Sequence, residues 1–124
     1  MYLTRCISVK EPAQKTSVIF YRTPGGNEPV REWLKALPKL DRLAVGQDLT
    51  RVQFRWPVGM PLCRPMGDGL WEIRTHLPSG RIARVLFCFC EGELWMLHGF
   101  IKKSPKTPDA DLTLARRHMK EIRR

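Results

Sequence analysis

The chain has 124 residues, the size of one domain with a single modest hydrophobic core. Its 22 Lys and Arg residues against 12 Asp and Glu residues give a net charge of +10, which favours RNA, DNA or an acidic protein as partner, although a solvated basic surface has the same composition. A hydrophobic content of 43% argues against disorder, and no apolar run reaches the roughly 18 residues of a membrane span.

The four cysteines indicate a reducing compartment rather than a disulfide or metal framework. They form no CxxC pair, and no histidine lies at zinc-ligand spacing. Cys88 and Cys90 share one face of an expected strand, where neighbouring residues are poorly placed for a disulfide. The N-terminus also lacks the apolar segment of a secretion signal. We therefore expect a cytoplasmic protein with free thiols, no metal and no cofactor.

The N-terminal half is predicted to contain one strand and two helices. Residues 1–16 are interpreted as an arm or an extra strand that precedes the main domain, residues 17–124. A β-prone run opens this domain at residues 17–21 and ends before a Pro-Gly-Gly turn. Apolar residues at helical spacing predict a first helix over residues 29–37 and a second over residues 39–56, with prolines at their ends.

The C-terminal half is predicted to contain two hairpins and a helix. A connector rich in Pro and Gly, residues 57–69, could include a short edge strand around residues 62–66. Strand candidates follow at residues 70–77, 82–90 and 94–103, separated by Pro-Ser-Gly and Glu-Gly turns.

The last helix is predicted from its start signals and its apolar stripe. Thr107 is the expected N-cap and Pro108 the first helical residue. The stripe consists of Leu112, Ala115, Met119 and Ile122. The order β-α-α-β-β-β-α predicts a small α+β domain in which helices pack outside a curved antiparallel sheet.

Alternation along the three C-terminal strands divides their side chains between two faces. The face expected to meet the helices carries Trp71, Ile73, Thr75, Val85, Phe87, Phe89, Trp95, Leu97 and Ile101. The opposite, mostly polar face carries Glu72, Arg74, His76, Arg84, Leu86, Met96, His98, Phe100 and Lys102. The following loop and the last helix add Lys103, Lys106, Arg116 and Arg117.

A cationic sheet face suits phosphodiester cleavage, because fixed guanidinium and ammonium groups stabilise charge on the phosphate oxygens. RNA supplies its own nucleophile, the 2′-hydroxyl, so the protein needs a proton acceptor, a proton donor and cations. Structural alternatives stay open: Arg74 and Arg84 can pair with carboxylates such as Glu72 and Glu93 across the sheet. His98 can pack in the core, and the lysines can form a solvated loop.

Four separated blocks of sequence occur in one order: Phe20-Tyr21, Pro29–Leu34, Gly69–Arg74 before Arg84-Val85, and Leu97–Pro108 with Asp111-Leu112 and Leu114–Arg117. Over residues 17–123 they resemble the HigB-like branch of the RelE/ParE superfamily, a phage-derived toxin-like family of type II toxin–antitoxin systems. The blocks agree with the elements that periodicity predicts. Unlike many RelE-type relatives, the chain has no tyrosine between Ser104 and Asp111.

The resemblance implies a RelE-like fold and a metal-independent endoribonuclease that cuts messenger RNA on the ribosome and so inhibits translation. The catalytic residues that it implies are Arg74, Arg84, Lys102, Lys103 and His98. The RNA-binding residues are Lys106, Glu72, Arg116 and Arg117, with Glu72 also a candidate general base beside His98. The implied partners are messenger RNA, the ribosome and a cognate antitoxin, a HigA-like helix-turn-helix protein, with no membrane.

Two other functions use the same scaffold. A ParE-like toxin would poison DNA gyrase by binding protein instead of cutting RNA. A non-catalytic protein would keep only the surface that binds nucleic acid or the antitoxin. The strand arginines and the lysine-rich loop favour RNA cleavage over both.

Overall fold

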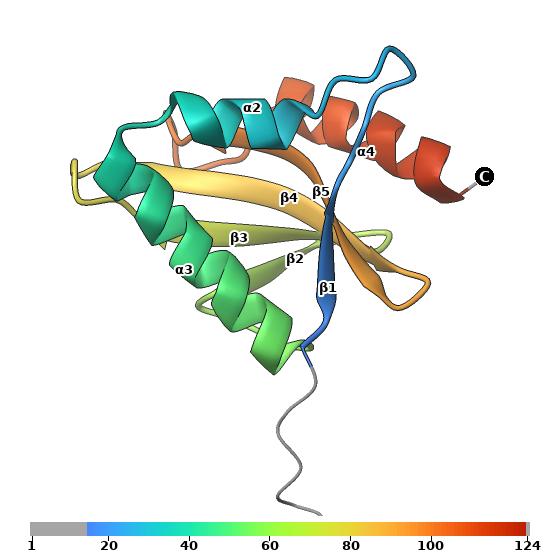
Figure 1. Cartoon of the computed structure of the whole chain (residues 1–124), viewed down its shortest axis with the longest axis horizontal. Coiled ribbons are helices and arrows are strands. Elements are labelled where there is room, and N and C mark those ends of the chain that lie inside the picture. The colour runs from blue at the N-terminus through green and yellow to red at the C-terminus, as the bar shows by residue number, and fades with distance from the viewer. Residues whose placement is uncertain (1–14, 124) are drawn as a thin grey trace, which may run out of the picture.

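An open five-stranded sheet in the order β1-β5-β4-β3-β2 organises residues 15–123, the part of the chain that the computed structural model describes (Figure 1). Its strands are β1 (Ser17–Phe20), β2 (Cys63–Gly67), β3 (Leu70–His76), β4 (Ile82–Cys90) and β5 (Glu93–Ile101). The predicted arm at residues 1–16 lies almost wholly outside the described residues. The predicted strands agree with the observed ones to within a few residues, including the edge strand β2.

The sheet is mixed, so the prediction of an antiparallel sheet is wrong in one respect. β1 pairs in parallel with β5, while β2, β3, β4 and β5 form successive antiparallel pairs. Between β1 and β5 the chain passes through both N-terminal helices and three strands. Parallel pairing of this kind joins strands far apart in sequence, which a local pattern does not reveal.

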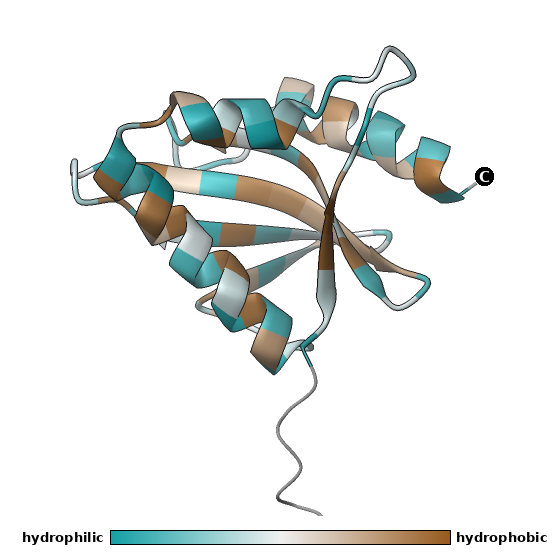
Figure 2. Cartoon of the chain, viewed as in Figure 1, coloured by the Kyte–Doolittle hydropathy of each residue, from teal (hydrophilic) through white to brown (hydrophobic). Residues whose placement is uncertain are grey.

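Helices cover both faces of the sheet. The helices α2 (Pro29–Ala36) and α3 (Lys39–Arg55) lie on one face, and α4 (Asp109–Arg123) lies on the other. Figure 2 shows mostly hydrophobic strands between helices of mixed character. Within the described residues, no helix is both long enough and apolar enough to cross a bilayer.

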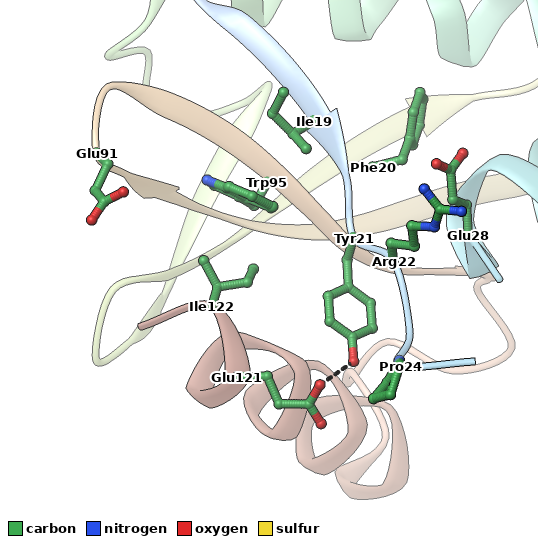
Figure 3. A pocket seen from close by; sticks show the side chains of 10 residues that line it. All are labelled: Ile19, Phe20, Tyr21, Arg22, Pro24, Glu28, Glu91, Trp95, Glu121 and Ile122. Atoms are coloured by element: carbon green, nitrogen blue, oxygen red, sulfur yellow. Dashed lines mark hydrogen bonds between the residues drawn. The ribbon is translucent and has the colours of Figure 1, made fainter. Parts of the chain in front are cut away.

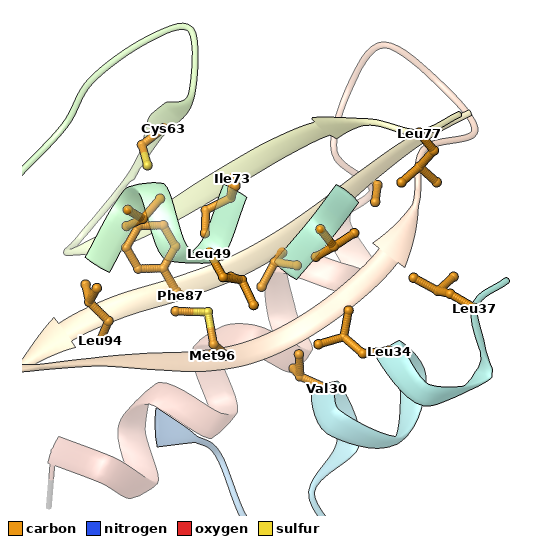
Figure 4. Packing of buried hydrophobic residues seen from close by; sticks show 14 residues of the cluster. Val30, Leu34, Leu37, Leu49, Cys63, Ile73, Leu77, Phe87, Leu94 and Met96 are labelled. Atoms are coloured by element: carbon orange, nitrogen blue, oxygen red, sulfur yellow. The ribbon is translucent and has the colours of Figure 1, made fainter. Parts of the chain in front are cut away.

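Each face carries its own apolar cluster. The larger cluster joins α2 and α3 to the strands, with Val30, Val45, Phe87 and Met96 fully buried (Figure 4). The second joins α4 to the opposite face, and its members include Leu86, Cys88, Leu97, Ala115 and Met119. The predicted stripe of the last helix is therefore confirmed as the surface that packs on the sheet.

A β-bulge in β5 changes which side chains face which helices. Leu86 pairs with His98, but the next residue, Phe87, pairs with Met96, so Leu97 is the extra residue. As a result Met96 packs towards α2 and α3, whereas Trp95 and Leu97 pack towards α4. The predicted faces of these three residues are wrong, because strict alternation fails at a bulge.

Candidate active site

A histidine and a carboxylate meet where β5 approaches the start of α4. The ring atom Nε2 of His98 lies 2.6 Å from Oδ1 of Asp111, and the two side chains are 17% and 24% exposed. Because a carboxylate can only accept, it holds the imidazole proton on Nε2 and leaves Nδ1 as an acceptor. The ring of Phe100 stacks beside His98 with centroids 5.6 Å apart, which further restrains the imidazole. This geometry suits a general base.

The loop that connects β5 to α4 carries three lysines, Lys102, Lys103 and Lys106. The amide of Lys102 donates to the carbonyl of Ile82 at 2.7 Å, which fixes the start of the loop. Lys103 is exposed and lines a cavity of about 390 Å³ together with Asp111 and Trp33. Lys106 is also exposed, and its one salt bridge within the described part of the chain is a 3.9 Å contact with Asp109. Asp111 therefore contacts His98 and lines the same cavity as Lys103, and the loop carries two further lysines.

Arg84 lies beneath this loop and not on its surface. Its side chain is only 1% exposed, so the expectation of an exposed cation on the sheet is wrong. The guanidinium donates to the hydroxyl of Thr107 at 2.8 Å and to the carbonyl of Pro105 at 3.2 Å, and Nη1 lies 3.5 Å from Oε2 of Glu72. The reason is that α4 and the loop before it cover this part of the predicted polar face.

Glu72 completes a buried network with these residues. It is fully buried, and its Oε2 accepts the hydroxyl of Thr107 at 2.6 Å. The prediction of Thr107 as the helix cap and Pro108 as the first helical residue is wrong by one position, because α4 begins at Asp109. Glu72 pairs with Arg84, as the structural alternative anticipated, and it is shielded from solvent. The atoms Glu72 Oε1 and Arg84 Nε have no hydrogen-bond partner among the described residues.

The remaining predicted site residues lie elsewhere. Arg74 is the register partner of Arg84, but its side chain lines a separate cavity beside α3. Arg116 donates to the carbonyls of Met66 at 3.0 Å and Gly67 at 3.2 Å, so it holds the turn between β2 and β3. Arg117 is exposed and lies near Tyr21, at the far end of α4 from the loop lysines.

Sequence reasoning missed a second cluster, at the other end of α4. Tyr21 donates to Glu121 at 2.6 Å and stacks on the buried ring of His118, with centroids 4.1 Å apart. Burial, followed by the contact with Glu121, raises the pKa of Tyr21 to about 12. Tyr21 and Glu121 line a cavity of about 520 Å³ together with Trp95 (Figure 3). The cluster ties β1 to α4, and it contains none of the loop lysines.

Asp111 was also missed as a partner of His98. From the sequence alone, Asp111 is interpreted as an acidic residue in the first turn of a helix, where its charge complements the helix dipole. No sequence signal selects it over Asp109 as the partner of the histidine. Within residues 15–123, no three His, Cys, Asp or Glu side chains gather as the ligands of a metal do.

Comparison with known proteins places the central part of the chain in one family. The model of the family described as "Phage derived protein Gp49-like (DUF891)" matches residues 32–120. No curated protein matches the chain. The matched range begins inside α2 and ends inside α4, so it contains the four C-terminal strands and the lysine loop.

Proposed function

Because the chain belongs to the phage-derived Gp49-like family, which is associated with RelE-like toxins, we propose that it is a toxin that cuts messenger RNA. The observation that carries the proposal is the His98–Asp111 pair at the base of the lysine loop. A base fixed by a carboxylate, next to a loop that carries three lysines, fits cleavage by the RNA's own 2′-hydroxyl.

In the proposed reaction, Nδ1 of His98 takes the proton of a ribose 2′-hydroxyl. The 2′-oxygen then attacks the adjacent phosphorus, and the bond from phosphorus to the 5′-oxygen of the next nucleotide breaks. The ammonium of Lys103 protonates the leaving 5′-oxygen, while Lys102 and Lys106 offset the charge on the phosphate. The products are a 2′,3′-cyclic phosphate and a 5′-hydroxyl end.

Arg84 and Glu72 act indirectly in this proposal. Their buried network holds the backbone at Pro105 and the side chain of Thr107, so it sets the position of the loop that carries the lysines. We assign them as positioning residues. Arg74 is assigned to the path of the RNA beside β3.

The test is cleavage of a defined messenger RNA on purified translating ribosomes, with and without the protein. We expect new 5′ ends that carry a hydroxyl, and we expect His98→Ala to produce none. The same RNA without ribosomes measures whether the ribosome is required. Ends that carry a 5′-phosphate would contradict the mechanism, because they require attack by water. Inhibition of DNA gyrase without RNA cleavage would favour the alternative toxin class.

The proposed partner is an antitoxin, expected to be a helix-turn-helix protein with an acidic segment. Lysines 102, 103 and 106 give such a segment a cationic surface to cover. Binding of the antitoxin should protect the cytoplasmic translation machinery from the toxin. The affinity of the antitoxin for the toxin should weaken as the salt concentration rises. The measurement is the dissociation constant between 50 and about 500 mM salt. An affinity that does not change over this range would indicate that apolar contacts dominate the interface.

A further inference from the structure

A second basic cavity opens beside β3, at the edge of the sheet opposite β1. It measures about 480 Å³, and its polar lining comprises Asp48, Arg51, Arg55, Arg74 and His76. Two of the arginines belong to the last turns of α3, and Arg74 and His76 belong to the end of β3. The family resemblance singled out only Arg74 among these residues.

The cavity has an excess of positive charge. Asp48 is its one carboxylate among the described residues, and it is already bonded to Arg51 and to the hydroxyl of Thr75. Arg55 and Arg74 form no salt bridge within residues 15–123, and the Nε atom of Arg74 is buried without a partner. Unpaired guanidinium groups that share a concave site attract an anion more strongly than isolated surface cations do.

The rest of the lining suits the non-phosphate part of a nucleotide. Residues 58–62 form the neighbouring wall, and the side chain of Met60 in that wall is 67% exposed. An exposed apolar side chain beside the arginines provides a surface on which a ribose or a base can lie. A free inorganic anion would use the arginines alone.

The cavity and the candidate active site flank the same end of the sheet. Arg74 pairs in register with Arg84, and Arg84 pairs with Phe100, which stacks beside His98. At about 4.8 Å between neighbouring strands, the backbones of Arg74 and Phe100 lie roughly 10 Å apart. Two residues further along β3, His76 pairs with Ile82, and the carbonyl of Ile82 accepts the amide of Lys102. One strand of RNA can therefore reach both sites.

We propose that this cavity is a second phosphate-binding subsite, in which Arg55 and Arg74 hold a backbone phosphate of the RNA strand that is cut beside His98. The identity of the ligand rests on the proposed function, whereas the anion site rests on the cavity itself. The subsite increases affinity and selects RNA long enough to span both sites, without a part in the chemical step.

Two probes test the subsite in the full chain. Inorganic phosphate is titrated while amide NMR signals are recorded, and a fluorescent 12-nucleotide single-stranded RNA is titrated at several salt concentrations. Arg55→Gln is the test variant because Arg55 is exposed and ends α3. Arg22→Gln is the matched control, since it removes an equally exposed arginine at the cavity beside Glu121.

We expect phosphate to shift the signals of residues 55–62 and 74–76 in the wild type and in Arg22→Gln, but not in Arg55→Gln. For the 12-nucleotide RNA, Arg55→Gln should raise the dissociation constant about fivefold and lower the salt slope by about 0.7. Its cleavage rate at saturating RNA should equal that of the wild type. Arg55→Lys should restore part of the affinity, because it keeps the charge but loses the guanidinium fork.

The subsite would be overturned if Arg55→Gln bound RNA with the affinity and salt slope of the wild type. If the wild type still cut RNA, the proposed function would stand. Phosphate shifts confined to other residues would overturn the subsite as well. If phosphate binds the cavity but the wild-type protein neither binds nor cuts RNA, the anion site stands and the proposed function fails.

Discussion

Arg84 and Thr107 are joined by a 2.8 Å hydrogen bond, although 23 positions separate them in sequence. This bond connects the central strand β4 to the end of the loop that carries Lys102, Lys103 and Lys106. Glu72 lies behind both residues and balances the charge of the guanidinium. The position of the loop is therefore coupled to a buried ion pair in the sheet.

Replacement of Arg84 by Ala is expected to destabilise the fold as well as to abolish RNA cleavage. The change leaves the carboxylate of Glu72 buried without its cation, which typically costs about 3–5 kcal/mol. Arg84→Lys should recover little, because an ammonium does not reproduce the fork that binds Pro105 and Thr107. The measurement is urea denaturation of each variant.

A double variant separates the structural from the functional part of this effect. Arg84→Met with Glu72→Leu removes both charges, and such apolar replacements are often neutral for stability. We expect the double variant to unfold at nearly the wild-type urea concentration while its cleavage rate stays low, because the loop has lost its anchor. Normal cleavage in a stable double variant would show that the network does not position the loop.

Substitutions at the His98–Asp111 pair should act on the reaction more than on the fold. His98→Ala should lower the rate of RNA cleavage by about 10²–10⁴-fold, the usual contribution of a general base. Asp111→Asn should lower it less, since the amide can still contact the ring. Asp109→Asn is the control, because Asp109 is 86% exposed two residues away. Equal rates of RNA cleavage for the Asp111 and Asp109 variants would show that Asp111 has no role in the reaction.

Replacement by alanine should change the stability of the protein in opposite directions at two glycines, Gly99 and Gly46. A Cβ atom at Gly99 would lie 2.5 Å from the ring of Trp33, so Gly99→Ala should lower the free energy of unfolding by about 1–3 kcal/mol. At Gly46, inside α3, no atom of residues 15–123 beyond the helix's own backbone and the two neighbouring residues lies within 4 Å of the added carbon. Gly46→Ala should therefore stabilise the protein by about 0.5–1 kcal/mol. Thermal unfolding of both variants checks the pair, and a stable Gly99→Ala would mean that the Trp33 ring is not confined to this position.

The buried thiols should be unreactive at neutral pH. Burial raises the pKa of Cys63 to about 12 and that of Cys88 to about 11, so almost no thiolate forms near pH 8. Cys90 is half-buried and should be alkylated before Cys63 and Cys88, the other two cysteines within residues 15–123. Site-resolved mass spectrometry after iodoacetamide treatment measures the order. Alkylation of Cys63 before Cys90 in the folded protein would contradict it.

The same shifts predict a loss of stability in alkaline solution. Because the folded pKa values of Cys63 and Cys88 lie above the ordinary value of 9.0, the folded state holds protons that the unfolded chain releases. Their contribution is complete below pH 9 and declines as the pH rises towards 11 and 12. Urea denaturation between pH 7 and 11 should show this decline, and Cys63→Ala should make it shallower. An unchanged pH profile in that variant would remove Cys63 as a cause.

The predicted faces of the sheet were correct for β3 and β4, but the exposure of the polar face was not. Alternation places Glu72 and Arg84 on one face, and the structure agrees. The same face also carries Leu86 and Cys88, and the last helix carries an apolar stripe. Those apolar residues were the signal that α4 covers this face. The bulge at Leu97 left no comparable signal.

The sequence by itself determined the bounds of the helices and strands, the basic charge and the family resemblance, because these depend on local periodicity, turn residues and composition. Only the tertiary structure decided which groups meet. It paired His98 with Asp111, buried Arg84 beneath the lysine loop and placed Arg74 beside Arg55. Such contacts join residues distant in the chain, and they follow from helix packing and strand register, which no local pattern specifies.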